Sequence, residues 1–232
     1  MPDARSLVSP LPFGPAFDER DEHGRQVYDF WSEHLGLYDV FLGLALFGHE
    51  GKARRRALST LDLDAGERVL DVGCGPGSNF DALAERVGPA GRVVGLDSSR
   101  GMVRAARERA ARAPAPTAVL WGDATTLPTR ENSFDAAYAT LSLSAMPDPE
   151  SAIENPHEVL RPGGRLVVLD ARPFRTGAWR ALNPIVVPPA TYATNWYPEV
   201  DIPGTIRRTF ADAACWRTNA GSLYVATGRK SE

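Results

Sequence analysis

The stretch Val69-Leu70-Asp71-Val72-Gly73-Cys74-Gly75-Pro76-Gly77 decides the fold of this 232-residue chain. Its apolar residues predict a strand, which runs into a turn where three alternate positions lack a Cβ and then directly into a helix. Glycine is needed where a ligand touches the backbone and where a turn adopts positive φ. The spacing is GxGxG and departs from the GxGxxG of dinucleotide sites, because Ser78 occupies the sixth place. Alone the loop is a weak signal, since a tight structural turn also needs glycines.

Short apolar runs alternate with helical segments around this loop. The expected strands cover residues 68–71, 92–96, 118–121, 134–139 and 165–170, and the expected helices cover residues 79–87, 99–113 and 150–160. Such alternation predicts a parallel sheet with helices on both faces. Pro156 conflicts with the last of these helices, because proline removes an amide donor and crowds the preceding turn, so that helix is either kinked or begins near Asn155.

Three acidic residues follow successive strands of the predicted sheet. Asp71 lies two residues before Gly73, Asp97 ends the second strand, and Asp123 follows the third. The carboxyl ends of parallel strands meet at one edge, where such folds bind ligands. A carboxylate there can accept hydrogen bonds from both hydroxyls of a ribose, and another acceptor can meet the exocyclic amine of adenine. Either Asp97 or Asp123 alone would be interpreted as a helix cap or turn former, but the ordered set predicts a nucleoside site.

The segments before and after the predicted sheet are expected to form a helical cap and a lid-like insertion. Residues 1–25 contain four prolines and predict a loose arm. Apolar residues at helical spacing in 26–47 predict two helices broken near Gly36, with a third helix at 50–61. The basic cluster Lys52, Arg54, Arg55 and Arg56 in that helix is interpreted as a solvated face rather than a contact for phosphate or anionic lipid.

A single domain is expected at residues 26–232. Its parts are a helical cap (26–62), the ligand-binding core (63–171), a lid-like insertion (172–204) and a C-terminal helix and hairpin with the last strand at 223–227 (205–232). The insertion is rich in proline and aromatic residues, so it predicts either a lid over an apolar molecule or an irregular packed loop.

Composition excludes several classes of protein. Charge is nearly balanced, with 26 Lys+Arg against 29 Asp+Glu, so no nucleic-acid partner is expected. Cys74 and Cys215 form no CxxC or Cys/His cluster, which argues against a disulfide framework or a metal site and for a reducing compartment. The most apolar stretch, residues 35–48, is interrupted by Asp39 and too short to span a bilayer. We expect a cytoplasmic protein with no transmembrane segment, for which peripheral membrane contact stays open and the oligomeric state is undetermined.

The chain resembles the class I S-adenosylmethionine-dependent methyltransferases, particularly the quinone-biosynthesis and phospholipid N-methyltransferase branch (methyltransferase type 11). The motifs that carry the resemblance are VLDVGCGPG (69–77), VVGLDSSRGMV (93–103), GDATTLP (122–128), FDAAYATLSLSAMPD (134–148) and VLRPGGRLVVLD (159–170). The resemblance implies an α/β fold: a Rossmann-like, doubly wound, seven-stranded sheet, mostly parallel with the last strand antiparallel, under an N-terminal helical cap.

The resemblance also implies the cofactor, S-adenosylmethionine, and its contacts. Asp71, Gly73, Gly75 and Gly77 would face its methionine end, and Asp97 would hold the ribose. Ser98 and Met102 would flank the adenine, whose edge Asp123 and Ala124 would contact. Thr140 and Leu141 would close the pocket after the fourth strand. Met102 is almost equally well interpreted as a core residue, and Tyr28 and Tyr38 are further candidates for closing the pocket or for core packing.

The implied reaction is direct in-line displacement of the methyl group onto a small, lipophilic or aromatic acceptor, either a quinone ring carbon or an amine headgroup. Such chemistry requires alignment and exclusion of water, and a phenolic acceptor also requires a base. That base stays unassigned: His23 lies in the arm, His157 is expected to be exposed, and either His34 or His49 of the cap could face the acceptor.

Two departures from the branch weaken the quinone assignment. Ser144-Ala145-Met146 stands where polar or basic residues are usual, and Ala213-Ala214-Cys215-Trp216 stands where Gly-Phe usually precedes the sixth strand. The alternative functions are a nicotinamide-dependent oxidoreductase, disfavoured by the absent sixth-place glycine, and a non-catalytic nucleoside-binding or interaction protein.

Overall fold

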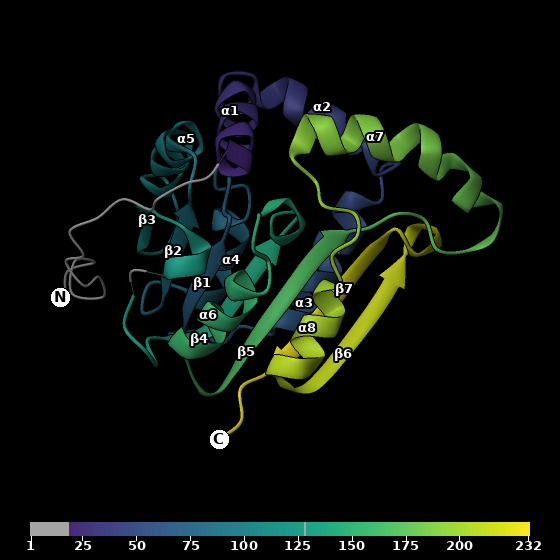
Figure 1. Ribbon diagram of the computed structural model, residues 1–232. Helices are drawn as coiled ribbons and strands as arrows, with labels where there is room; N and C mark the ends of the chain where they lie inside the picture. The colour runs from purple at the N-terminus through teal and green to yellow at the C-terminus, as the bar shows by residue number, and fades with distance from the viewer. Residues whose placement is uncertain (1–18, 128) are drawn as a thin grey trace.

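The strands form one seven-stranded sheet with the order β3-β2-β1-β4-β5-β7-β6 (Figure 1). The computed structural model describes residues 19–127 and 129–232. β1 to β5 run parallel, and β7 lies antiparallel between β5 and β6. The predicted doubly wound, mostly parallel sheet with an antiparallel last strand is thus confirmed. The strands are β1 (Arg68–Val72), β2 (Arg92–Asp97), β3 (Thr117–Trp121), β4 (Phe134–Thr140), β5 (Leu160–Ala171), β6 (Ala211–Thr218) and β7 (Leu223–Arg229).

Helices cover both faces of the sheet because both faces of its strands are apolar. In β1, Val69 packs into one core and Leu70 and Val72 pack into the other, as the two-residue period of a strand requires. The first core includes residues of α3 (Glu50–Leu61), α4 (Phe80–Val87) and α5 (Arg100–Ala110). The second core includes residues of α6 (Ser151–Val159) and α8 (Ile202–Thr209).

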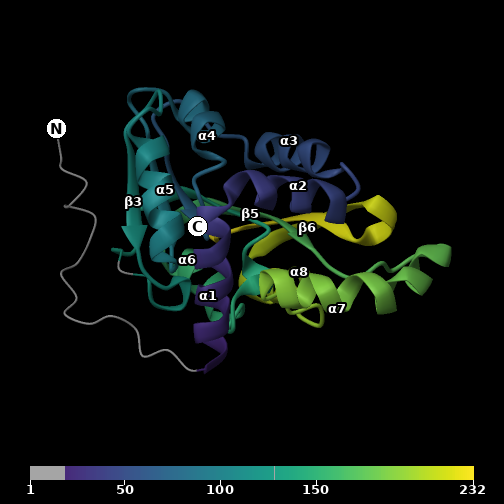
Figure 2. The ribbon, with the colours of Figure 1, turned by 90° about the horizontal axis from the view of Figure 1, so that it is seen from above.

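A third layer lies over the carboxyl ends of the parallel strands. It consists of α1 (Glu19–Glu33), α2 (Leu35–Ala45) and α7 (Asn183–Thr194), which Figures 1 and 2 show above the sheet. The Tyr28 hydroxyl donates to the Thr194 carbonyl at 3.0 Å, and Trp31 Nε1 donates to the Ala193 carbonyl at 2.7 Å. These bonds connect the N-terminal cap to a helix more than 160 residues away in sequence.

Several expected boundaries are wrong. Residues 19–25 belong to α1 and not to a loose arm, whereas residues 1–18 lie outside the described part of the chain. α6 runs through Pro156 and does not begin near Asn155, because Asp148 accepts hydrogen bonds from the Ser151 amide and hydroxyl and starts the helix there. The segment Ala213-Ala214-Cys215-Trp216 lies within β6 rather than before it.

The insertion is more regular than an irregular loop. It contains the 3₁₀ helix η4 (Gly177–Leu182) and α7, with Pro188 and Pro189 inside α7. The remaining 3₁₀ turns are η2 (Ala124–Thr126), η3 (Leu143–Ala145) and η5 (Asn219–Gly221). Among the described residues, none of the helices combines the length and apolar character needed to cross a membrane.

Candidate functional site

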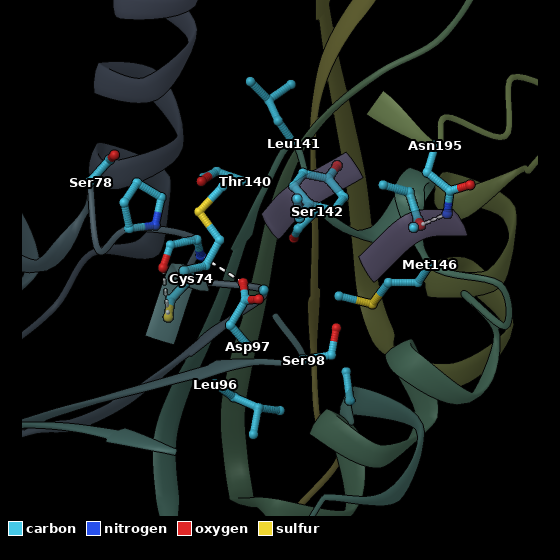
Figure 3. Close-up of a pocket in the computed structure, with 18 of the residues that line it drawn as sticks. Cys74, Ser78, Leu96, Asp97, Ser98, Thr140, Leu141, Ser142, Met146 and Asn195 are labelled. Atoms are coloured by element: carbon cyan, nitrogen blue, oxygen red, sulfur yellow. Dashed lines mark hydrogen bonds between the residues drawn. The ribbon is translucent and has the colours of Figure 1, made fainter. Parts of the chain in front are cut away.

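A cavity of about 370 Å³ lies at the carboxyl edge of the sheet, beneath the cap (Figure 3). This volume is within the range of small-molecule sites. The predicted residues that line it come from four successive strand ends: Gly73, Gly75, Asp97, Ser98, Met102, Asp123, Ala124, Thr140 and Leu141. Asp71 and Gly77, also predicted, lie outside the lining.

The glycine loop after β1 has the left-handed backbone that its sequence predicts. Gly73, Gly75 and Gly77 have φ of 65°, 54° and 80°. A Cβ on Gly73 would lie 2.5 Å from the Ser142 Cβ, whereas a Cβ on Gly75 would meet no atom within 4 Å. Gly75 therefore leaves open space next to the backbone, which a bound molecule can fill. A Cβ on Gly77 would instead collide with the ring of Phe80, so this glycine serves packing.

Asp97 connects the second strand to the glycine loop. Its Oδ2 accepts from the Gly75 amide at 2.8 Å, and its Oδ1 accepts from the Ser99 amide at 2.9 Å. Burial raises the pKa of this carboxyl to about 6, against the opposing effect of these backbone donors. At pH 7 and above the side chain is an anion with lone pairs left for a ligand, at the place where sequence predicts a ribose contact.

Asp71 lies behind the cavity in a polar network. Its carboxylate accepts from Asn79 Nδ2 at 3.1 and 3.3 Å. Asn79 Oδ1 in turn accepts from Arg54 Nη1 at 2.6 Å, and the same Nη1 donates to Thr140 Oγ1 at 3.1 Å. Burial raises the pKa of Asp71 to about 7, while Asn79 and the Arg54 charge lower it.

Arg54 and Asn79, which line the cavity, were not predicted as site residues. The interpretation of Arg54 as part of a solvated helix face is wrong: its side chain points inward and pairs with Glu50 at 2.7 Å. The inward orientation of Arg54 could have been predicted from the sequence. Arg54 stands three, four and seven residues before Ala57, Leu58 and Leu61, all of which are buried, so it shares their face of α3.

The opposite end of the cavity suits an aromatic base. Leu96, Met102 and Ala124 supply apolar walls, and Asp123 lies at the edge. Asp123 Oδ1 also accepts from the Thr125 amide at 2.8 Å, so the turn-forming role considered for this residue is present as well. Asp97 likewise has the structural role considered for it, because it accepts a hydrogen bond from the Ser99 amide at the start of α5.

A second, more apolar chamber of about 90 Å³ adjoins the first. The two share the lining residues Tyr28, Tyr38, Leu42, Leu141 and Ala145. Burial raises the pKa of both tyrosines, which therefore stay neutral at physiological pH. The remaining walls include inward-facing residues of α2 and α7, such as Phe41, Val187 and Ala190.

Asp170 brings one carboxylate into the wall of this second chamber. It lies at the end of β5 and is almost fully buried. Its Oδ1 accepts from Ser144 Oγ at 2.5 Å and from the Ala171 amide at 2.7 Å, and its Oδ2 accepts from the Ser144 amide at 2.9 Å. Burial raises its pKa to about 6. Trp196 Nε1, also in this wall, is buried without a hydrogen-bond partner among the described residues.

Leu141 forms part of the boundary between the two chambers. It has a φ of 53°, which costs a non-glycine residue about 1–3 kcal/mol. Its amide donates to the Leu169 carbonyl at 2.7 Å and so holds the residue in place after β4. Residues with such strained backbone are concentrated at functional sites. The strained residue here, Leu141, lines both chambers.

None of the four histidines lines either chamber in the described structure. His34 and His49, the histidines considered for facing the acceptor, are both exposed, with Nδ1 atoms near the backbone oxygens of Phe30 and Phe47. His157 packs against the Phe210 ring, and burial lowers its pKa.

Comparison with known proteins agrees with this architecture. Residues 69–164 match a family model described as a methyltransferase domain. The demethylmenaquinone methyltransferase of Desulfitobacterium hafniense is 34% identical over 167 residues, which cover 69% of this chain and 66% of that protein. The chain covers 32% to 66% of the length of the first four curated relatives that it matches.

Two solved structures share the fold. One chain of the complex between the Haloferax volcanii Trm112 methyltransferase activator and a methyltransferase superposes with a TM-score of 0.68 at 18% identity, over 90% of this chain and 97% of that one. Phosphoethanolamine N-methyltransferase 2 of Haemonchus contortus, solved with S-adenosyl-L-methionine, superposes with a TM-score of 0.60 at 17% identity, over 77% of this chain and 53% of that one.

Proposed function

The chain belongs to the class I S-adenosylmethionine-dependent methyltransferases, and we propose that it methylates a small, lipophilic or aromatic acceptor bound in the second chamber. One observation carries this proposal: a polar cavity of nucleoside size adjoins an apolar chamber across Leu141 and Ala145. Such an arrangement suits a polar cofactor on one side and an apolar acceptor on the other.

We propose that the polar cavity holds S-adenosylmethionine through residues at both of its ends. Asp97 would accept from the ribose, and Asp123 from the adenine amine. At the opposite end, Arg54 would pair with the carboxylate of the methionine tail, while Asp71 would act through Asn79 as a negative charge near the ammonium group. The open space at Gly75 supports this fit, because the backbone is accessible there.

Bound S-adenosylmethionine supplies a methyl group on a positively charged sulfur, which needs no further activation. The protein must therefore align the acceptor and exclude water. We propose that residues 26–62 and 172–204 close over the two chambers for this purpose. Their hydrogen bonds through Tyr28 and Trp31 support a joint closing role.

We further propose that Asp170 is the base for a phenolic or quinol acceptor. With a pKa of about 6 it is ionised at neutral pH, so it can accept a proton from a ring hydroxyl and make the ring a better nucleophile. The buried Trp196 Nε1 offers a donor for a second oxygen of the same ring. The name of the Desulfitobacterium hafniense relative also favours a quinone-type ring over an amine headgroup.

The test is methyl transfer from S-adenosylmethionine labelled in the methyl group. A demethylated naphthoquinol with a shortened prenyl tail is compared with phosphoethanolamine, and both labelled product and S-adenosylhomocysteine are measured. We expect equal amounts of the two products with the quinol and none with the amine. Transfer to the amine alone would refute the quinol assignment, and failure to bind S-adenosylhomocysteine would refute the whole proposal.

A further inference from the structure

Exposed apolar side chains are concentrated on one part of the molecule. Nine large hydrophobic residues are exposed among those described, and all except Trp121 lie on α1, α2, the turn after α2, η4 or α7. We define the apolar face as seven of them: Leu37, Val40, Leu44, Phe47, Trp179, Ile185 and Tyr192. Leu44, Ile185 and Tyr192 are 74%, 70% and 76% exposed. Isolated exposed hydrophobic residues are common, but a cluster of this kind marks an interaction surface.

The helices that carry the apolar face are nearly uncharged. Residues 181–198, which include α7, contain no Asp, Glu, Lys or Arg, and α2 contains only Asp39. Neither helix has a fully buried residue. A helix in contact with water normally carries charged residues on its outer side. Asp39 lines the polar cavity, on the side of α2 away from Leu37 and Leu44, so it does not interrupt the face.

An aromatic cluster connects the turn after α2 to η4, which leads directly into α7. The ring of Phe47, after α2, lies 6.0 Å from Phe174 and 6.2 Å from Trp179, measured between centroids. Phe174 and Trp179 are themselves 5.8 Å apart. Figure 1 shows α2 and α7 above the carboxyl ends of the strands, and Figure 2 shows them from above, α2 on the α3 side of β5 and β6 and α7 on the α8 side.

The charges beside this cluster are positive. Arg175 and Arg180 flank Trp179 and are exposed. Tryptophan and tyrosine side chains settle at the headgroup level of a membrane, and anionic headgroups attract basic side chains next to an apolar surface. A bilayer therefore complements this face in two ways: its hydrocarbon region accommodates the apolar side chains, and its negatively charged headgroups attract the arginines.

We infer that the apolar face docks peripherally on a bilayer containing anionic phospholipid. α2 and α7 lie in its interfacial region and Arg175 and Arg180 contact headgroups. The same two helices wall the second chamber with their inner sides, so docking places that chamber next to the hydrocarbon region. Uptake of the acceptor from the membrane rests on the proposed function, but docking itself does not.

The test is flotation of the full chain with vesicles of phosphatidylcholine alone or mixed with phosphatidylglycerol. The double variant Leu44→Glu/Ile185→Glu places two charges on the face. Its matched control, Ala211→Glu/Ala214→Glu, adds the same charges to the exposed side of β6. We expect wild type and control to float with the mixed vesicles, and the face variant to lose at least tenfold in partitioning. A second variant, Arg175→Gln/Arg180→Gln, is expected to lose the preference for anionic over neutral vesicles.

Two results would overturn the inference: wild type that does not float, or a face variant that floats as well as the control. Wild type that is dimeric by sedimentation, becomes monomeric in the face variant and does not float would assign the surface to self-association instead. S-adenosylhomocysteine affinity is measured on the same samples. Because none of the substituted residues lines a chamber, unchanged affinity separates failure of docking from failure of the proposed function.

Discussion

Replacement of Asp97 by asparagine tests the proposed ribose contact most directly. The substitution keeps the shape of the side chain and removes its charge. In the wild type, both carboxylate oxygens accept from backbone amides, at 2.8 Å from Gly75 and 2.9 Å from Ser99. An amide side chain has only one oxygen, so one of these two N–H groups would face an NH₂ group instead.

The expected loss of affinity follows from the lost ligand bond. A hydrogen bond to a charged group contributes about 1.5–3 kcal/mol. Since each 1.4 kcal/mol is tenfold in affinity, Asp97→Asn should weaken S-adenosylhomocysteine binding roughly 10-fold to 150-fold. The free energy of unfolding should change less. Asp97→Asn removes one hydrogen bond to a backbone amide, but it also removes a buried charge, which is unfavourable because burial already raises the pKa of this carboxyl.

Calorimetric titration with S-adenosylhomocysteine measures the affinity, and thermal unfolding of the same preparation measures stability. Asp212→Asn is the matched control: Asp212 is exposed on β6, and its φ of 50° is one that asparagine tolerates. Wild-type affinity in Asp97→Asn would refute the ribose assignment. A weakening shared equally by the control would refute any special role for Asp97.

The remaining predictions concern charge in and behind the two chambers. Arg54→Gln should weaken S-adenosylhomocysteine binding about tenfold by calorimetry, since a cation facing the cavity is lost, and unchanged affinity would contradict the proposed carboxylate pairing. Asp170→Asn should lower kcat for a quinol acceptor at least 100-fold with unchanged cofactor affinity. Wild-type kcat should rise with pH through about 6 as Asp170 ionises, and a flat profile would argue against it as the base. The ligand-free protein should melt at a higher temperature at pH 5 than at pH 8. In the folded protein the pKa values of Asp71, Asp97 and Asp170 are about 6 to 7, whereas in the unfolded chain they are near 4. The stabilisation from these raised pKa values is therefore complete below about pH 4 and is lost as the pH rises through about 6 to 7. Asp71→Asn should reduce that dependence in a thermal-shift series, and an undiminished dependence would exclude Asp71 as a contributor.

Local sequence sufficed for the parts of the site that lie within a few residues of a strand end. The glycine loop was predictable because positive φ at Gly73 and Gly75 is a property of the backbone itself. Asp97 and Asp123 were predictable because parallel strands end at one edge, so an acid at the end of each strand must lie there. The same regularity predicted the order of strands and helices between residues 68 and 171, whereas the helices of the insertion at 172–204 were not predicted.

Contacts between segments that are distant in sequence could be identified only from the tertiary structure. Arg54 belongs to a basic cluster in the sequence, yet its guanidinium meets Thr140, which is 86 residues away. Asp170 becomes chemically distinctive only in the folded chain, where burial beside an apolar chamber raises its pKa against the lowering effect of hydrogen bonds from Ser144 and the Ala171 amide. Helix and strand periodicity act over a few residues, whereas burial and charge pairing depend on which surfaces the fold brings together.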